Sequence, residues 1–198
     1  PRTMVMRERA QPRETFILTR GAYDKPEAKV THGTPAILPP LPAEAPTNRL
    51  ALANWLVAPE HPLTARVVVN RYWQLFFGTG LVKTTEDFGV QSERPSHPEL
   101  LDHLAPRFID QGWSVTKLIR ELVLTRSYQL SSDTVAANVQ ADPANRLVWR
   151  HTPRRLDAEE VRDAMLATSG KLIEQRPEGS PAQGFLVREL RNDGPEAK

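Results

Sequence analysis

Residues 62–78 read PLTARVVVNRYWQLFFG and form the most apolar helical pattern in the chain. A helix can begin between Pro62 and Thr64, and Gly78 follows Phe77 as a C-terminal cap. The apolar residues cover more than half of the helical circumference: Val68, Val69, Tyr72, Trp73, Leu75 and Phe76. The narrower polar arc consists of Arg66, Asn70, Arg71 and Gln74. This distribution predicts a helix at the centre of the fold.

Two further amphipathic segments flank this helix. Before it, NRLALANWLV (48–57) predicts a helix capped by Thr47 or Asn48, with a stripe of Leu50, Ala53, Trp55 and Leu56. After it, Ser96 and Glu99 have the spacing of a capping box that opens another helix. The buried stripe of that helix is Leu100, Leu101, Leu104, Phe108 and Ile109. Pro106 lies within the stripe and predicts a kink or two short helices.

Two more helices are expected in the second half of the chain. Ser114 caps a helix whose apolar residues follow the i, i+3, i+4, i+7 pattern: Val115, Leu118, Ile119, Leu122 and Val123. Asp157 and Glu160 form a second capping-box pattern. The helix that follows is expected to end before Gly170 and to bury Val161, Ala164, Met165 and Thr168.

Strand signals are few. Met4–Glu8, Thr15–Thr19 and Arg146–Arg150 have the composition of short strands, and the third is expected to pair with the second. The segment 26–46 is rich in proline, which removes N–H donors and excludes regular ladders. It is either a linker or an extended arm lying on the domain, and the apolar Ile37, Leu38 and Leu41 favour the arm. The predicted fold is mainly α with a minor antiparallel β element (α+β), an irregular helical domain with a Pro-rich extended arm.

The same patterns divide the chain into three parts. Residues 1–46 are expected to hold the strands and the arm, 47–174 the helical core domain, and 175–198 a loosely ordered, truncated segment. The chain opens on Pro1 without an initiator Met or an apolar leader, so we expect a piece of a longer protein.

Composition excludes several classes of function. Of 198 residues, 39% are hydrophobic, which suits a folded domain. The 26 Lys and Arg are interleaved with 24 Asp and Glu, which argues against nucleic-acid binding. There is no cysteine, so the chain can hold no disulfide, thiolate metal site or CxxCH haem attachment. No stretch approaches the ~20 apolar residues needed to span a bilayer, so we expect no membrane insertion.

Three groups of side chains are candidates for chemistry. Glu159 and Asp163 lie four apart on one helix face near Arg155, which suits a metal or an acid/base pair, or simply a solvated charged face. Arg66 and Asn70 could grip a carboxylate or sugar hydroxyls, or could hold neighbouring loops by hydrogen bonds. The aromatic residues are interpreted as core rather than as a sugar platform: Tyr72, Trp73, Phe76, Phe77, Phe88 and Trp113. The five histidines lack the spacing of a zinc site, and we expect no metal.

Seven segments, in order, resemble one family. They are TFILTRGAYDKP (15–26), VTHGTPAILPPLP (30–42), NRLALANWLV (48–57), HPLTARVVVNRYWQLFFGTGLVKTTEDFG (61–89), SHPELLDHLA (96–105), DPANRL (142–147) and RRLDAEEVRDAMLATSG (154–170). Together they are similar to the planctomycete-type secreted-protein domain, domain of unknown function 1553. The resemblance implies an extracytoplasmic (periplasmic or secreted) setting in a large multidomain protein. It also implies haem c elsewhere in that protein, with neighbouring domains of the same polypeptide as partners.

Two functions remain open at this point. The first is an accessory or scaffold domain that packs against its neighbour in a cytochrome c-linked assembly, because no reactive constellation is recognisable. The second is part of an extracytoplasmic enzyme acting on polysaccharide. The pool of candidate residues for that enzyme is Asn70, Arg71, Glu86, Asp87, His97, Arg155, Glu159 and Asp163.

Overall fold

The computed structural model describes residues 7, 9, 11, 13–46 and 48–174. Helices and one two-stranded antiparallel sheet make up its regular structure, which confirms a mainly α fold with a minor β element. Contacts divide the chain into the units Pro1–Pro153 and Arg154–Lys198, and each is considered by itself. The expected strand at 4–8, apart from residue 7, and the expected loose segment 175–198 lie outside the described residues. The predicted boundaries at 46 and 174 stay predictions.

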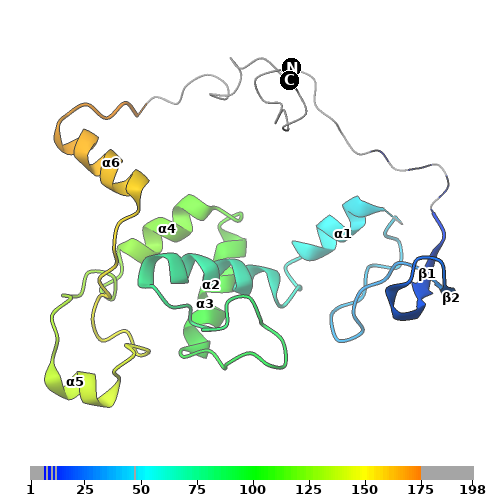
Figure 1. Ribbon diagram of the computed structural model, residues 1–198, viewed down its shortest axis with the longest axis horizontal. Coiled ribbons are helices and arrows are strands. Elements are labelled where there is room, and N and C mark those ends of the chain that lie inside the picture. Colours follow the sequence, from blue (N-terminus) through cyan, green and yellow to red (C-terminus); the bar gives the residue numbers. More distant parts are fainter. Residues whose placement is uncertain (1–6, 8, 10, 12, 47, 175–198) are drawn as a thin grey trace, which may run out of the picture. The chain divides into compact units, whose positions relative to one another are not determined.

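The core of the first unit is built by three helices. Helix α2 (Thr64–Phe77) packs against α3 (Pro98–Asp110) and α4 (Val115–Val123), and so occupies the central place that its apolar pattern predicts (Figure 1). The buried cluster consists of Ala65, Val69, Trp73, Phe77, Leu81, Val82, Leu101, Leu104, Ala105, Phe108, Leu118 and Leu122. The aromatic residues pack in or against this cluster, which confirms their interpretation as core.

Local signals fix the ends of two of these helices. Gly78 ends α2 with a φ of 84°, a left-handed conformation that glycine adopts without a Cβ clash. The Ser114 hydroxyl accepts the Lys117 N–H at 3.4 Å and caps α4. The glycine and the capping serine each lie directly beside the helix end that they determine. Both helix ends could therefore be predicted from the sequence alone.

The start of α3 differs from the prediction. Its N-cap is His97, and no side chain caps its first turn. The Ser96 hydroxyl instead donates to the carbonyl oxygen of Leu81 at 3.3 Å, so the predicted capping box is wrong. The helix is one element through Pro106, so the alternative of two short helices is also wrong.

The sheet pairs strands other than those expected. Strand β1 (Thr15–Leu18) is antiparallel to β2 (Pro26–Val30), with Phe16 opposite Lys29. The short helix η1 (Thr19–Gly21) lies between the two strands. The prediction that prolines exclude a ladder from this segment is wrong, because Pro26 is the first residue of β2, where its missing N–H is tolerated.

Two helices lie outside the central cluster. Helix α1 (Arg49–Leu56) is capped by Asn48, whose Oδ1 accepts the Ala51 N–H at 2.9 Å, as predicted. Its buried residues are Ala51 and Trp55, so the predicted stripe is right only at Trp55. Helix α5 (Ala136–Ala141) was not predicted. Among the described residues, no helix is long and apolar enough to cross a membrane.

The second unit contains helix α6 (Ala158–Thr168), which begins with the predicted capping box of Asp157 and Glu160. The residues expected to be buried are exposed instead, among them Val161 and Met165. An apolar stripe is buried only where another element covers it, and within the described part of this unit none covers α6.

Candidate functional site

The candidate residues predicted from the sequence are spread over both units. In the first unit Arg71 pairs with Glu86 at 3.3 Å on the surface, and Asp87 accepts the Gly89 N–H at 2.7 Å. His97 Nδ1 lies 3.0 Å from the hydroxyl oxygen of its neighbour Ser96. Arg155, Glu159 and Asp163 belong to the second unit. None of the pool lines either of the two cavities described below.

Asn70 is the candidate with the clearest contacts, and it acts within the fold. It is fully buried, its Nδ2 donates to the Val82 carbonyl at 2.9 Å, and its Oδ1 accepts the Val82 N–H at 2.8 Å. Arg66 donates to Asp102 at 2.8 Å and to the Pro62 carbonyl at 2.6 Å. Of the two interpretations of Arg66 and Asn70, the structure therefore supports the one in which they hold neighbouring segments.

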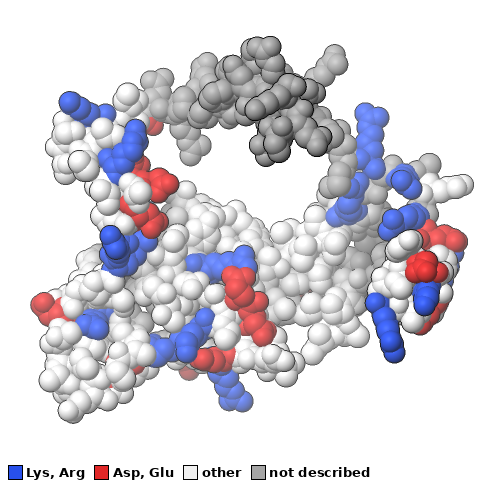
Figure 2. Space-filling model, viewed as in Figure 1, with Lys and Arg blue, Asp and Glu red and all other residues white. Residues whose placement is uncertain are grey.

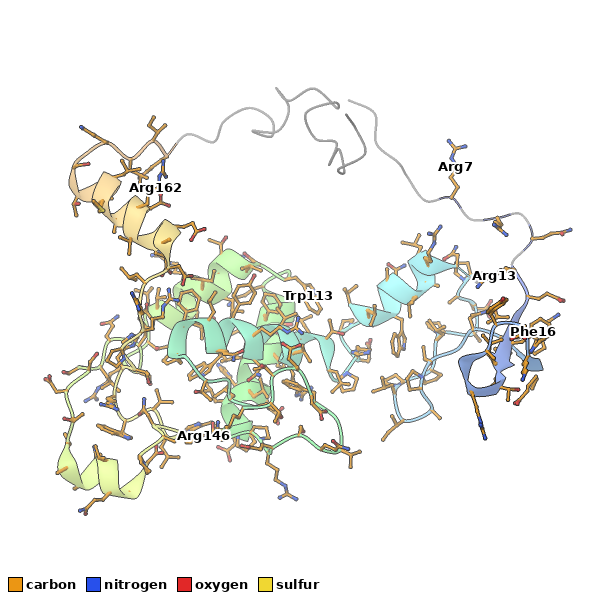
Figure 3. The ribbon with its side chains drawn as sticks, viewed as in Figure 1. Arg7, Arg13, Phe16, Trp113, Arg146 and Arg162 are labelled. Carbon is orange, nitrogen blue, oxygen red and sulfur yellow. The ribbon has the colours of Figure 1, made fainter. Side chains whose placement is uncertain are left out.

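Charged side chains at the start of α6 form a helix cap. The Asp157 N–H donates to Glu160 at 2.9 Å, and Arg154 also bonds to the Glu160 carboxylate. This backbone hydrogen bond, and then Arg154, lower the pKa of Glu160 below its ordinary value. Arg162 pairs with Asp163 at 3.2 Å in the same helix, and Figure 3 shows its side chain on the exterior of α6.

Acid is expected to weaken this cap. Because the pKa of Glu160 is lowered in the folded state, its stabilising contribution is present at neutral pH and is lost as the pH falls through that lowered pKa. A carboxyl-detected NMR titration should place the Glu160 midpoint below that of an unstructured glutamate. Arg154→Gln should raise the midpoint only in part, since the Asp157 N–H remains. A Glu160 midpoint at the ordinary value would contradict the cap.

Residues 142–152, here called the arginine loop, have a backbone that is fixed by their own side chains. The Asp142 carboxylate accepts the N–H groups of Arg146 and Leu147 at 2.9 and 2.7 Å. Asn145 Oδ1 accepts the N–H groups of Trp149 and Arg150 at 3.0 and 3.3 Å. These amides are therefore occupied, which is why the strand predicted at 146–150 is wrong.

Two residues of the arginine loop have left-handed backbone conformations. The φ of Asn145 is 52° and that of Val148 is 53°. A β-branched residue such as Val148 adopts this region only at an energetic cost, so its surroundings must hold it there. Asn145 contributes to this, because its Nδ2 also donates to the Arg150 carbonyl and to the Thr152 hydroxyl, both at 2.9 Å.

The arginine loop closes a cavity of about 180 Å³ against the end of α2 and the segment after it. Its apolar wall includes Trp73, Phe77 and Val148, and Gly80 also lines it. Its polar lining consists of Thr79, Ser96, Asn145, Arg146, Arg150 and Thr152. In Figure 3 the labelled Arg146 lies where the loop that follows α5 returns toward the core helices. We call this space the arginine cavity.

Sequence reasoning missed the arginine cavity. Its walls come from residues 73–80, from Ser96 and from 143–152, which are far apart in the chain. The available signal was DPANRL (142–147), in which Asp and Asn favour turns that bond to their own backbone and an arginine follows at once. A turn in place of a strand at this point would have indicated the loop.

A second, more apolar groove of about 510 Å³ lies between the Pro-rich arm and α1. The Trp55 indole N–H donates to the Pro39 carbonyl at 2.8 Å and so fixes the arm to the helix. His61 is 7% exposed, and its Nδ1 accepts the Thr64 N–H at 3.2 Å, while its Nε2 is buried without a hydrogen-bond partner. Prolines make up much of the groove wall: Pro39, Pro40, Pro42 and Pro46.

Neither a metal nor a haem c site is indicated by these residues. Among residues 7, 9, 11, 13–46 and 48–174, no group of three or more His, Asp or Glu side chains could hold a metal ion. The residues of this chain do not fit covalent haem c, because the thioether bonds require cysteines and the sequence has none.

Comparison with known proteins identifies the family. Residues 48–191 match the model of the family described as "Protein of unknown function (DUF1553)", which is more than half of the 198-residue chain. No curated protein and no solved structure matches the chain. The match agrees with the resemblance carried by the sequence segments from 48 onward. The chain therefore belongs to the DUF1553 family.

Proposed function

We propose that this chain is an accessory domain that packs, through the exposed side of α1, against a neighbouring domain of the same exported polypeptide. The observation that carries the proposal is the apolar surface that α1 presents to solvent. Leu50 is 64% exposed, and Leu52, Leu56 and Val57 are also exposed. Such a concentration of aliphatic side chains on one short helix is typical of an interaction surface.

The exposed aliphatic residues of α1 lie on one side of the helix. At about 100° per residue, Leu52, Leu56, Ala53, Val57 and Leu50 span about 160° of the helix, and the exposed Arg49 of the first turn falls between Leu56 and Ala53. Ala51 and Trp55 lie on the other side, where they line the groove beneath the arm. The helix is thus anchored by one face, and its other apolar face has no cover within the described residues.

The charge distribution supports the same proposal. Figure 2 shows Lys and Arg in small groups mixed with Asp and Glu, and an uncharged surface over most of α1. Burial of uncharged aliphatic surface carries no cost for removing charges from water, whereas burial of a charged face does. The α1 surface is therefore better suited to a stable domain contact than the mixed-charge surface.

The setting and the partner follow the family resemblance. We propose an extracytoplasmic location, and a haem c module in the same polypeptide as a neighbour. The alternative, an enzyme acting on polysaccharide, has less support, since none of its candidate residues lines the arginine cavity or the groove between the arm and α1.

Substitution of Leu56 should test the docking of α1. In the parent polypeptide, amide hydrogen exchange across residues 49–57 is expected to be at least about tenfold slower than in the isolated 198-residue chain, because docking protects the helix. Leu56→Lys, at a position 41% exposed, should restore the fast exchange without unfolding the domain.

Val90→Lys is the matched control, because Val90 is fully exposed and belongs to the loop between α2 and α3. It introduces the same charge and should leave the protection of α1 intact. Equal exchange rates in the parent polypeptide and in the isolated chain would show that α1 is not a docking surface.

A further inference from the structure

The arginine cavity has an unbalanced positive charge. Two arginines, Arg146 and Arg150, line it, and no Asp or Glu is among its lining residues. Arginines that line a partly enclosed space favour an anion there, because the interaction is less screened than on an open surface.

Arg150 has no counter-ion within the described residues. Its Nε is buried and has no hydrogen-bond partner, and its guanidinium carbon lies 4.9 Å from the centre of the Trp149 ring. The aromatic ring offsets part of the cost of burying the charge but accepts none of the in-plane N–H bonds. Within the described residues the Arg150 guanidinium therefore has no oxygen acceptor, and an oxyanion would supply one.

Arg146 is only weakly neutralised. Its closest carboxylate is that of Glu93, at 3.9 Å, and the same Glu93 accepts from Lys83 at 3.3 Å. One carboxylate therefore serves two cations, which leaves a net positive charge beside the cavity. The Arg146 side chain is 25% exposed, so solvent ions can reach it.

Hydroxyl groups add further hydrogen-bond donors to the arginine cavity. The Thr152 oxygen already accepts from Asn145 at 2.9 Å, so its own O–H is free to donate to a ligand. Thr79 contributes a second hydroxyl to the lining. Guanidinium and hydroxyl groups together are the donors that proteins use for sulfate, phosphate and carboxylate oxygens.

The cavity is prearranged and small. The Asp142 and Asn145 hydrogen bonds fix the loop that carries both arginines, so little ordering is required on binding. A volume of about 180 Å³ equals the share of roughly six water molecules. This is enough for one tetrahedral oxyanion or one carboxylate group, but not for an extended sugar chain.

We propose that the arginine cavity binds a single oxyanion group, a sulfate, phosphate or carboxylate, between Arg146 and Arg150. The group is either a free ion or a charged substituent of a larger molecule whose remainder stays outside. This inference concerns a different surface from α1 and does not depend on the docking role proposed above.

Calorimetric titration of the 198-residue chain with sodium sulfate, against sodium chloride at equal ionic strength, tests the site. Arg150→Gln and Arg146→Gln should each weaken sulfate binding at least about tenfold. Arg150→Lys keeps the charge but loses the planar set of donors, and should also bind more weakly than the wild type. Arg120→Gln is the matched control on the exposed face of α4 and should leave the affinity unchanged.

A second readout requires no variant. The Arg150 Nε–H resonance should shift on addition of sulfate and saturate at the concentration found by calorimetry, which keeps the test valid if Arg150→Gln does not fold. Absence of saturable binding by sulfate, phosphate and acetate alike would overturn the proposal. Equal weakening by Arg120→Gln and Arg150→Gln would also overturn it.

The source of the group is tested by a separate titration. The affinities of sulfated and uronic oligosaccharides, expressed per charged group, are compared with those of inorganic sulfate and acetate. If an oligosaccharide binds at least tenfold more tightly than the free ion, and Arg150→Gln abolishes this binding, the ligand of the site is a charged group on a polymer. If the oligosaccharides and the free ions bind equally tightly, and Arg150→Gln weakens both, the site is supported and its ligand is the free ion.

Discussion

Replacement of Asn70 by alanine is expected to lower the free energy of unfolding by about 2 to 6 kcal/mol. The variant leaves both the N–H and the carbonyl of Val82 buried without their partner, and each unsatisfied buried group costs about 1 to 3 kcal/mol. Urea unfolding followed by circular dichroism measures this difference.

Two further variants define the role of Asn70. Asn70→Asp keeps an acceptor for the Val82 N–H but has no donor for the Val82 carbonyl, so it should also be strongly destabilised. Arg71→Ala, the next residue on α2, lies on the surface in an exposed ion pair and should change stability by less than about 0.5 kcal/mol. Equal effects of the Asn70→Ala and Arg71→Ala variants would contradict the buried role of Asn70.

Gly80→Ala is expected to destabilise the fold by about 3 kcal/mol, at the upper end of the usual cost of overpacking. A Cβ at this position would lie 2.5 Å from the Val82 carbonyl oxygen and 2.8 Å from Asn70 Nδ2. Neither atom can move without breaking the hydrogen bonds between Asn70 and Val82. Gly80 also lines the arginine cavity, so the substitution should weaken sulfate binding as well.

Gly33→Ala is the control for this substitution. A Cβ at Gly33 would meet no atom within 4 Å, and the backbone there requires no left-handed conformation. Because alanine reduces the freedom of the unfolded chain, the change should be neutral or slightly stabilising. A Gly80→Ala protein as stable as Gly33→Ala would show that the loop after α2 adapts more readily than its contacts indicate.

The helices of the core could be predicted from the sequence, whereas the capping of α3 could not. Ser114 and Asn48 bind N–H groups three residues away, so the cap is contained in the local sequence. Ser96 has the same chemistry, but its hydroxyl is used by the Leu81 carbonyl, fifteen residues earlier. A contact between distant segments replaced the local one.

The candidate site also depends on contacts between distant segments that local sequence patterns do not predict. The pool of candidate residues rests on residue type and spacing, and spacing along a helix does not show which side chains share a cavity. The apolar and aromatic neighbours of Arg146 and Arg150 predict a strand. Hydrogen bonds from Asp142 and Asn145 turn this segment into a loop instead. These bonds depend on side-chain geometry that a composition rule does not contain.

The sequence by itself determined the helical class, the central position of α2, the caps of α1, α4 and α6, and the family, because each depends on periodicity or on contacts within a few residues. The tertiary structure alone decided that Asn70 is a buried clamp, that α1 presents an apolar face, and that two arginines share a cavity with the end of α2. Burial and the net charge of a cavity depend on surfaces brought together from distant parts of the chain. Local sequence patterns therefore do not predict them.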